Sequence, residues 1–234
     1  LDELVAMRDA VHRTLRLLGT GSVGESLWGV LESLPSLALE LCKAVPSLLI
    51  DDNGYRLRSQ AAGTLRNVFM HLLRNSIDHG IESGDERVAN GKPAAGTIDI
   101  EVGVDHDLLQ VTLSDDGRGL ALSRIRDIAI GRGWIAAGEK LDDDAIAQLI
   151  FRPGFSTAHA VTEVSGRGVG MDAVRDFLAR EHGHIELRFT DDRHGADFRQ
   201  FQTVVCLPDR MAVDSLGTDA RRDVDASRAG ALVG

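Results

Sequence analysis

Three short segments that lie far apart in the chain place the strongest constraint on how it folds. HLLRNSIDHGIE at 71–82 falls on a helix, and DDGRGL at 115–120 follows an apolar strand. The third segment, FSTAHAVTEVSGRGVGMDAV at 155–174, crowds glycines before the start of another helix. One pocket for a base, a metal ion and a polyphosphate would need all three parts, so we expect the fold to bring them together.

The spacing of apolar residues predicts helices and strands in mixed order. Helices are expected at 1–18, 27–45, 57–80, 121–131, 142–150 and 169–181. Strands are expected at 47–50, 97–102, 108–114, 184–189 and 201–208. Residues 19–24 read as a flexible break, and the chain after 210 offers little material for a core. This order predicts an α/β protein, more closely an α+β two-layer sandwich, in which helices cover one face of a mixed, largely antiparallel sheet.

The composition narrows the classes of function. A net charge of −10 disfavours a nucleic acid partner, because its phosphates carry the same sign. No apolar run approaches the length of a membrane span, so we expect no direct membrane insertion. Cys42 and Cys206 are too few for a disulfide framework, and we expect both to be buried, reduced thiols of a cytoplasmic protein.

The helix at 57–80 carries polar side chains beside its apolar face. Asn75, Asp78 and His79 follow His71 at offsets of four, seven and eight, which predicts one polar stripe. The amide oxygen of Asn75 suits Mg²⁺, and the two histidines could contact phosphate or complete the metal shell. For each residue taken alone, the alternative is a solvated helix surface.

Asp115 follows the strand at 108–114 and precedes two glycines. A carboxylate held there could accept a hydrogen bond from an exocyclic amine such as that of adenine. Gly117 and Gly119 would let the backbone approach a flat ligand closely. An ordinary turn is the alternative, because Asp-Asp-Gly favours turns in any case.

Gly166, Gly168 and Gly170 precede the helix predicted at 169–181. Backbone N–H groups at a helix N-terminus favour phosphate oxygens. The spacing G-x-G-x-G after a long loop does not match the dinucleotide fingerprint, and the segment lacks the lysine of a P-loop. A flexible loop remains the alternative.

Four segments, taken in this order, resemble the ATP-binding domain of CheA-type chemotaxis histidine kinases: HLLRNSIDHGIE, ERVANGKPAAGTI, DDGRGL and FRPGFSTAHAVTEVSGRGVGMDAV. The wider group is the GHKL, or Bergerat-fold, ATPases. The resemblance extends over roughly 57–190 and weakens toward both ends.

The resemblance implies a role for each matching residue, with ATP and Mg²⁺ as cofactors. Asn75 would carry the metal with His79 nearby, and His71 takes the place where hydrolysing relatives keep a glutamate base. His71 and Asn75 would be catalytic. The remaining nucleotide-binding residues would be Arg74, Asp78, His79, Asp115, Gly117, Gly119, Phe155, Ser156, Thr157, Arg167, Gly168, Val169 and Gly170.

The same resemblance divides the chain into three parts. Residues 1–30 would be an N-terminal helical segment or linker, 31–210 the histidine-kinase-like ATP-binding domain, and 211–234 a C-terminal tail. The ATP lid would extend over about 132–168, with Phe151 and Phe155 as apolar latches.

The implied function is transfer of the γ-phosphate of Mg·ATP to a histidine on a separate domain or protein, in two-component signalling. The implied partners are a histidine phosphotransfer domain, a response regulator reached through it, and a second copy of the chain in a homodimer. Two alternatives stay open: a non-catalytic ATP sensor of the same fold, and a GHKL hydrolase, which His71 disfavours. An anti-sigma serine kinase is a weaker possibility.

Overall fold

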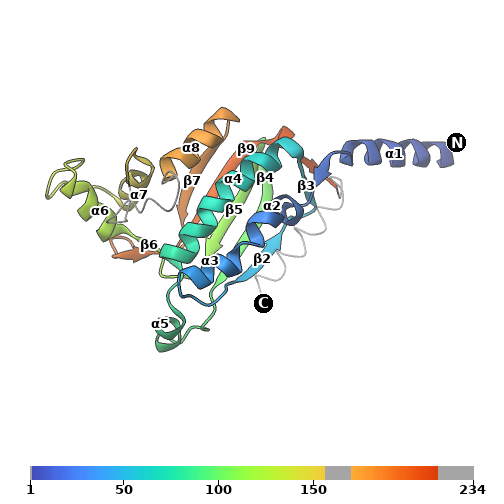
Figure 1. Ribbon diagram of the computed structural model, residues 1–234. Coiled ribbons are helices and arrows are strands. Elements are labelled where there is room, and N and C mark those ends of the chain that lie inside the picture. Colours follow the sequence, from blue (N-terminus) through green and yellow to red (C-terminus); the bar gives the residue numbers. More distant parts are fainter. Residues whose placement is uncertain (1, 156–169, 216–234) are drawn as a thin grey trace.

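The computed structural model describes residues 2–155 and 170–215, and a five-stranded sheet forms its centre (Figure 1). The strand order is β2-β4-β5-β9-β7, in which β2 and β4 are parallel and the other neighbours are antiparallel. The prediction of a mixed, largely antiparallel sheet is therefore confirmed. The strands are β2 (Ser47–Asp51), β4 (Thr97–Asp105), β5 (Leu108–Asp115), β7 (His184–Phe189) and β9 (Phe201–Pro208).

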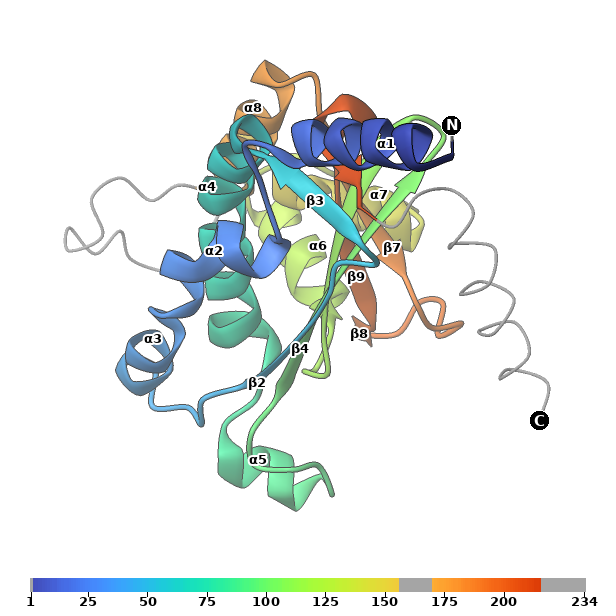
Figure 2. The ribbon, with the colours of Figure 1, turned by 90° about the vertical axis from the view of Figure 1, so that its right-hand side faces the viewer.

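Helices form the second layer on one face of this sheet. Figure 2 shows α2, α4 and α8 on the same side of the strands, as a two-layer sandwich requires. Helix α1 projects away from the layers as the expected N-terminal extension (Figure 1). The helices are α1 (Asp2–Leu17), α2 (Val23–Leu31), α3 (Leu34–Glu40), α4 (Ser59–Asn75), α5 (Gly84–Ala89), α6 (Leu122–Gly131), α7 (Asp143–Gln148) and α8 (Met171–Arg180), with short 3₁₀ turns η2 (Leu149–Phe151) and η3 (Asp209–Met211).

The core lies between the sheet and these helices. Strands β4 and β5 bury every second side chain, so one face of the hairpin is apolar, as their alternation predicts. Helix α4 buries residues at spacings of three and four on the side that faces this sheet. The buried members of α4 are Ala61, Leu65, Val68, Phe69, Leu72 and Leu73.

Two small sheets were not predicted. Strands β1 (Thr20–Gly21) and β10 (Ala212–Asp214) flank β3 (Tyr55–Arg58), and β6 (Leu120–Ala121) pairs with β8 (Phe198–Arg199). The sequence predicts a flexible break at 19–24 and little core material after 210, whereas Met211 and Val213 are buried. Strands of two or three residues are too short to show a period, which explains the omission.

The predicted helix at 57–80 also differs in detail. Residues 57 and 58 belong to β3, α4 begins at Ser59, and the last five residues form a π-helical segment, η1 (Ser76–Gly80). The tertiary pairing of β3 with β1 and β10 decides the first difference.

The prediction that both cysteines are buried is confirmed for Cys206 and wrong for Cys42. Cys206 is buried on β9, but Cys42 is exposed, and both are free thiols. Helix α3 ends at Glu40, so Cys42 lies beyond the helix, in a left-handed conformation with φ of 53°. Among the residues that the structure describes, no helix is long and apolar enough to cross a membrane.

Candidate functional site

The end of α4 is shaped by a π-helical turn and a lysine. The backbone N–H of Ile81 donates to the carbonyl of Ser76, five residues earlier, at 2.7 Å. Lys43 Nζ donates to the carbonyls of Ile77, Asp78 and Ile81 at 2.5, 2.7 and 2.6 Å. These bonds satisfy carbonyls that the widened turn would otherwise leave open. Single π-helical turns recur at functional sites, and here one begins directly after Asn75 and ends at Gly80.

Asp115 sits against this turn in a cradle of two glycines. A Cβ atom on Gly80 would lie 2.9 Å from both carboxylate oxygens of Asp115. One on Gly117 would lie 2.3 Å from the Gly80 carbonyl oxygen and 2.7 Å from Asp115 Oδ1. Because any side chain at either position would collide with these atoms, the close approach requires glycine.

Burial and hydrogen bonds act on the pKa of the Asp115 carboxylate in opposite directions. Its Oδ1 accepts a hydrogen bond from the Gly117 amide at 3.0 Å. Burial raises the pKa of Asp115 above its ordinary value, although hydrogen bonds from Ser76 and from the Gly117 amide act in the opposite direction. A half-buried carboxylate of this kind can accept a hydrogen bond from a donor on a ligand, and it disfavours a ligand that places an acceptor there.

A buried ion-pair network supports the loop that follows Asp115. Arg87 is fully buried and contacts Glu82 Oε2 at 3.1 Å and Asp116 Oδ2 at 2.8 Å. Lys92 Nζ donates to Glu82 Oε1 at 2.9 Å and to the carbonyls of Asp116 and Gly117 at 2.9 and 3.0 Å. Asp116 Oδ1 accepts from the backbone N–H of Thr97 on β4 at 2.8 Å.

This network was not singled out from the sequence. Arg87 and Lys92 lie in ERVANGKPAAG, Glu82 ends HLLRNSIDHGIE, and Asp116 lies in DDGRGL. All three segments contribute to the family resemblance, but their spacing alone does not reveal an ion pair. Burial alone would raise the pKa of Glu82, yet hydrogen bonds from Lys92 and Arg87 outweigh it and hold that pKa below its ordinary value. The network therefore fixes the loop beneath Asp115 with charged partners in a low-dielectric environment.

Asn75 links the same region to the start of α8. Its Nδ2 lies 3.3 Å from Met171 Sδ, and Gly170 forms the N-cap of α8 in an extended conformation. The 71–82 segment thus contacts α8 through Asn75, and it contacts Asp115 through Gly80. The structure brings together the described parts of all three segments, as the sequence predicts.

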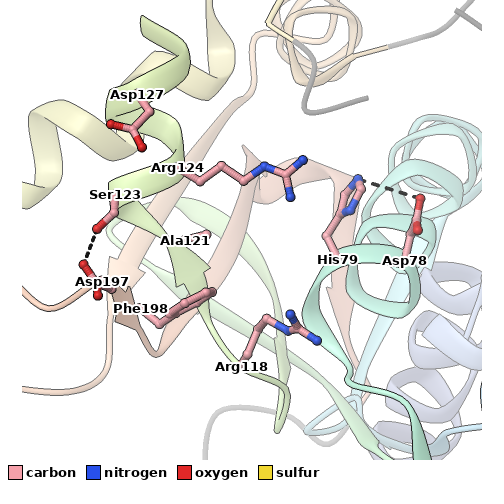
Figure 3. A pocket seen from close by; sticks show the side chains of 9 residues that line it. All are labelled: Asp78, His79, Arg118, Ala121, Ser123, Arg124, Asp127, Asp197 and Phe198. Atoms are coloured by element: carbon pink, nitrogen blue, oxygen red, sulfur yellow. Dashed lines mark hydrogen bonds and ion pairs between the residues drawn. The ribbon is translucent and has the colours of Figure 1, made fainter. Parts of the chain in front are cut away.

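A cavity of about 470 Å³ opens beside this junction (Figure 3). Of the predicted residues, Asp78 and His79 line it, whereas His71, Asn75 and Asp115 are not among its lining residues. Figure 3 shows the side chains of Arg118, Arg124 and His79 converging on the hollow from the β5–β6 loop, α6 and η1. The lining residues that sequence reasoning missed are Arg118, Ala121, Ser123, Arg124, Asp127, Asp197 and Phe198.

The predicted histidines lie in different environments. Burial, and then the charge of Arg74, lowers the pKa of the half-buried His71. Burial also lowers the pKa of His79, against the opposing effect of Asp78, whose Oδ2 lies 3.7 Å from His79 Nε2. Both rings are therefore mainly neutral near pH 7. Arg74 is exposed and lies 3.7 Å from Glu40.

Phe155 anchors the chain where the described part ends. Its ring centroid lies 6.2 Å from that of Trp134, and the guanidinium of Arg132 lies over both rings at 5.9 and 5.1 Å. Phe151, the other predicted latch, is buried in the core. The remaining predicted site residues lie outside the described residues: Ser156, Thr157, Arg167, Gly168 and Val169.

Comparison with known protein families gives a match over most of the folded region. Residues 61–209 match the family described as histidine kinase-, DNA gyrase B- and HSP90-like ATPases. The matched range contains the Asp115 cradle, the π-helical turn, the ion-pair network and the cavity. Membership of this family implies ATP binding.

Curated relatives carry the comparison further. The chemotaxis protein CheA of Treponema pallidum is 36% identical over 177 residues, which is 76% of this chain and 21% of that protein. The gliding motility regulatory protein of Myxococcus xanthus is 46% identical over 130 residues, 55% of this chain and 17% of that protein. CheA of Salmonella typhimurium is 43% identical over 118 residues, 50% of this chain and 17% of that protein.

The chain spans about a fifth of the length of these relatives. Among solved structures, the mycobacterial sensor histidine kinase MprB covers 81% of this chain and 95% of its own, at 13% identity and a TM-score of 0.49. That likeness is too distant to support an argument about the site. The sequence matches are sufficient: the chain belongs to the histidine kinase-, DNA gyrase B- and HSP90-like ATPases, as an ATP-binding catalytic domain of the CheA type.

Proposed function

We propose that this domain binds Mg·ATP and presents the γ-phosphate to a histidine on another domain or protein. The observation that carries the proposal is the junction at η1, where Gly80 touches Asp115 and Asn75 touches the first residue of α8. A recognition point for the base and a helix N-terminus for phosphate are thereby joined by one short helical turn.

Asp115 is proposed to accept the exocyclic amine of adenine. The glycine cradle supports this role, because it holds the carboxylate against backbone and leaves no room for another side chain. The Arg87 network beneath it keeps the loop in place before a ligand arrives, which reduces the entropy lost on binding.

Asn75 is proposed to hold Mg²⁺ through its amide oxygen, since its amide nitrogen takes the contact with Met171. When bound, the ion would offset the charge of the phosphates and fix their geometry. His79 lies one turn further on and is better suited to phosphate, because Mg²⁺ prefers oxygen ligands. Arg118 and Arg124 in the cavity supply positive charge for the same anion.

His71 is proposed to position the reacting groups. Its lowered pKa leaves a neutral ring that can donate one hydrogen bond and accept another. The resemblance places His71 where hydrolysing relatives keep a glutamate base, and we take the absence of that glutamate to favour transfer to a protein acceptor over hydrolysis.

The proposed partners follow from similarity to CheA proteins. They are a histidine phosphotransfer domain and, through it, a response regulator, in chemotaxis or a related two-component pathway. Helix α1 exposes Leu4, Met7 and Leu15, and Leu18 directly after it is also exposed, which supports a homodimer in which these side chains are covered.

Titration with ATP tests the binding site. Asp115→Asn replaces an acceptor with an amide and is expected to remove most of the ATP affinity while circular dichroism stays unchanged. Asp99→Asn, on the exposed side of β4, is the matched control and is expected to bind as the parent does. Equal affinities for parent and Asp115→Asn would refute the adenine assignment.

Incubation with labelled ATP and candidate phosphotransfer domains tests the reaction. His71→Ala is expected to keep ATP affinity and to slow phosphate transfer, whereas Asn75→Ala is expected to lose the Mg²⁺-dependent part of the affinity. Tight ATP binding without transfer to any candidate would favour the non-catalytic sensor. Release of phosphate to water at the same rate with and without acceptor would favour a hydrolase.

A further inference from the structure

The face of the sheet turned away from the helices carries a cluster of metal-binding side chains. On β7 and β9, the side chains of Ile185, Leu187, Val205 and Leu207 belong to the core. Side chains alternate along a strand, so His184, Glu186 and Cys206 point to the opposite face. Their ligand atoms all lie within 4.8 Å of one another.

The strand register explains why these three side chains meet. His184 and Cys206 are paired directly across the antiparallel β7–β9 ladder. Glu186 lies two residues beyond His184 on the same strand and therefore on the same face. Two ordinary features of a sheet, cross-strand pairing and alternation, are enough to create the cluster.

We propose that His184, Glu186 and Cys206 bind a zinc ion that links the edge strand β7 to β9. Imidazole nitrogen, carboxylate oxygen and thiolate sulfur are the ligand types of zinc in proteins, and a set of three leaves the fourth position to water. Magnesium and calcium are disfavoured, because they prefer oxygen ligands.

The geometry of the first pair suits this ion. His184 Nε2 and Glu186 Oε1 are 3.0 Å apart. Two ligands at ordinary zinc bond lengths of about 2.1 Å, in a tetrahedron, are about 3.4 Å apart. The ion can therefore take the position of the shared hydrogen after a small movement of either side chain.

Arg188 holds the carboxylate without blocking this position. Its Nε and Nη2 donate to Glu186 Oε2 at 3.0 and 2.7 Å, while Oε1 faces His184. Arg188 Nη1 also reaches Gln110 Oε1 on β5 at 3.3 Å. A ligand carboxylate hydrogen-bonded through its second oxygen is typical of metal sites.

Cys206 must lose its proton to become a ligand. Burial, together with the charge of Glu186, raises its pKa to about 11, so the thiol is protonated at neutral pH when no ion is bound. On binding, the thiol proton leaves to solvent and the sulfur lone pair forms the bond to zinc; no redox change is involved.

Titration of the nucleotide-free, chelator-treated chain with Co²⁺ tests the site, because a cobalt–thiolate bond gives a near-ultraviolet absorption band. One equivalent is expected to bind with this band, and Zn²⁺ is expected to displace it. Cys206→Ser should abolish the band, and His184→Ala or Glu186→Gln should weaken binding at least about tenfold.

Two matched controls separate this site from other ligands. Cys42→Ser removes the exposed thiol, and His182→Asn removes the neighbouring histidine while tolerating its positive φ. Both are expected to leave the titration unchanged. Should Cys206→Ser fold poorly, His184→Ala and Glu186→Gln decide the question, since both positions are accessible to solvent. The proposal is overturned if no thiolate band forms, or if the band depends on Cys42. Neither result depends on ATP binding.

Discussion

Two buried arginines, Arg87 and Arg199, each lie between a pair of carboxylates, but they organise different parts of the molecule. Arg87 contacts Glu82 and Asp116 at 3.1 and 2.8 Å. Arg199 contacts Asp143 and Asp191, both at 2.9 Å, and its guanidinium lies 4.1 Å from the ring centroid of Phe189. Each guanidinium is almost entirely removed from solvent.

The difference lies in what each arginine holds. Arg87 binds the side chain of Asp116, which belongs to the loop beneath Asp115. Arg199 joins α7 to the chain after β7, and it meets the Asp115 loop only through its backbone: a Cβ on Gly119 would lie 2.4 Å from the Arg199 carbonyl oxygen. The comparison indicates that Arg87 fixes the loop beneath the proposed adenine-binding carboxylate, whereas Arg199 fixes α7 against the segment after β7.

Removing Arg87 should have the largest effect on stability. Arg87→Met leaves the buried carboxylate of Glu82 with Lys92 alone, and loss of one partner from a buried ion pair costs about 3–5 kcal/mol. Urea unfolding measures the change. Glu40→Gln breaks the exposed contact with Arg74 and is expected to cost less than about 1 kcal/mol. Similar costs for the two variants would mean that the Arg87 network contributes little.

Gly117→Ala should come next. The added Cβ would lie 2.3 Å from the Gly80 carbonyl oxygen, so the Asp115 loop or η1 must move, at a cost of about 1–3 kcal/mol. Gly63→Ala provides the control, because nothing lies within 4 Å of its Cβ and alanine stabilises a helix interior by about 0.5–1 kcal/mol. Thermal unfolding of both variants distinguishes a steric conflict from a general effect of the methyl group. A neutral Gly117→Ala would contradict the close approach.

ATP affinity should separate the two arginines directly. Arg87→Met is expected to weaken binding about tenfold, or about 1.4 kcal/mol, because the loop beneath Asp115 loses its anchor. Arg199→Met should weaken it less, since its side chain contacts α7 and the segment after β7. Calorimetric titration of both variants, at a temperature where each is folded, gives the comparison. Equal losses of ATP affinity would show that the Arg87 and Arg199 ion pairs do not differ in their effect on the proposed ATP site.

The smallest expected effect is on how the free energy of unfolding changes with pH in the acid range. Hydrogen bonds from Arg199 and the Gln200 amide lower the pKa of Asp191. For Asp143, burial acts upward, but the Gly195 amide and Arg199 outweigh it and lower its pKa. These carboxylates bind protons less readily in the folded state, so their contribution is complete above the ordinary pKa of about 4 and is lost as pH falls below it.

Arg199→Met and Arg87→Met should reduce this pH dependence of the free energy of unfolding by different amounts. Arg199→Met removes the cation shared by Asp143 and Asp191, whereas Glu82 keeps Lys92 in Arg87→Met. Stability measured between neutral pH and about pH 3 is therefore expected to depend less on pH in Arg199→Met than in Arg87→Met. The opposite order would show that acid sensitivity arises at the Arg87 network.

Prediction from the sequence succeeded where the spacing of apolar residues, or one residue type with narrow preferences, indicates the structure. The β4–β5 hairpin follows from alternation, α4 from helical spacing and β9 from a short apolar run, because their apolar side chains must be buried. It failed for β1, β3 and β10, whose two to four residues depend on partners elsewhere in the chain. Cys42 was misplaced because a helix end is set by local backbone geometry beyond the apolar pattern.

The site shows the same division. Asp115, Gly117 and Asn75 stood out because few residue types suit a turn, a close backbone approach or a hard cation. Lys43, Arg87 and Arg124 did not, since a lysine or arginine is usually a solvated surface residue and its spacing gives no sign of burial. Asp78 and His79 were expected on one stripe with His71, but the π-helical turn directs them to the cavity instead.

The sequence by itself determined the alternating sheet, the long amphipathic helix and the three segments that must converge, because each is encoded in local periodicity or in a residue with narrow conformational preferences. Only the tertiary structure decided which charges are buried together, how η1 turns between Asn75 and Asp115, and that β7 and β9 align His184 with Cys206. Such pairings depend on distances between segments far apart in the chain. A single sequence carries no measure of those distances until the core is packed.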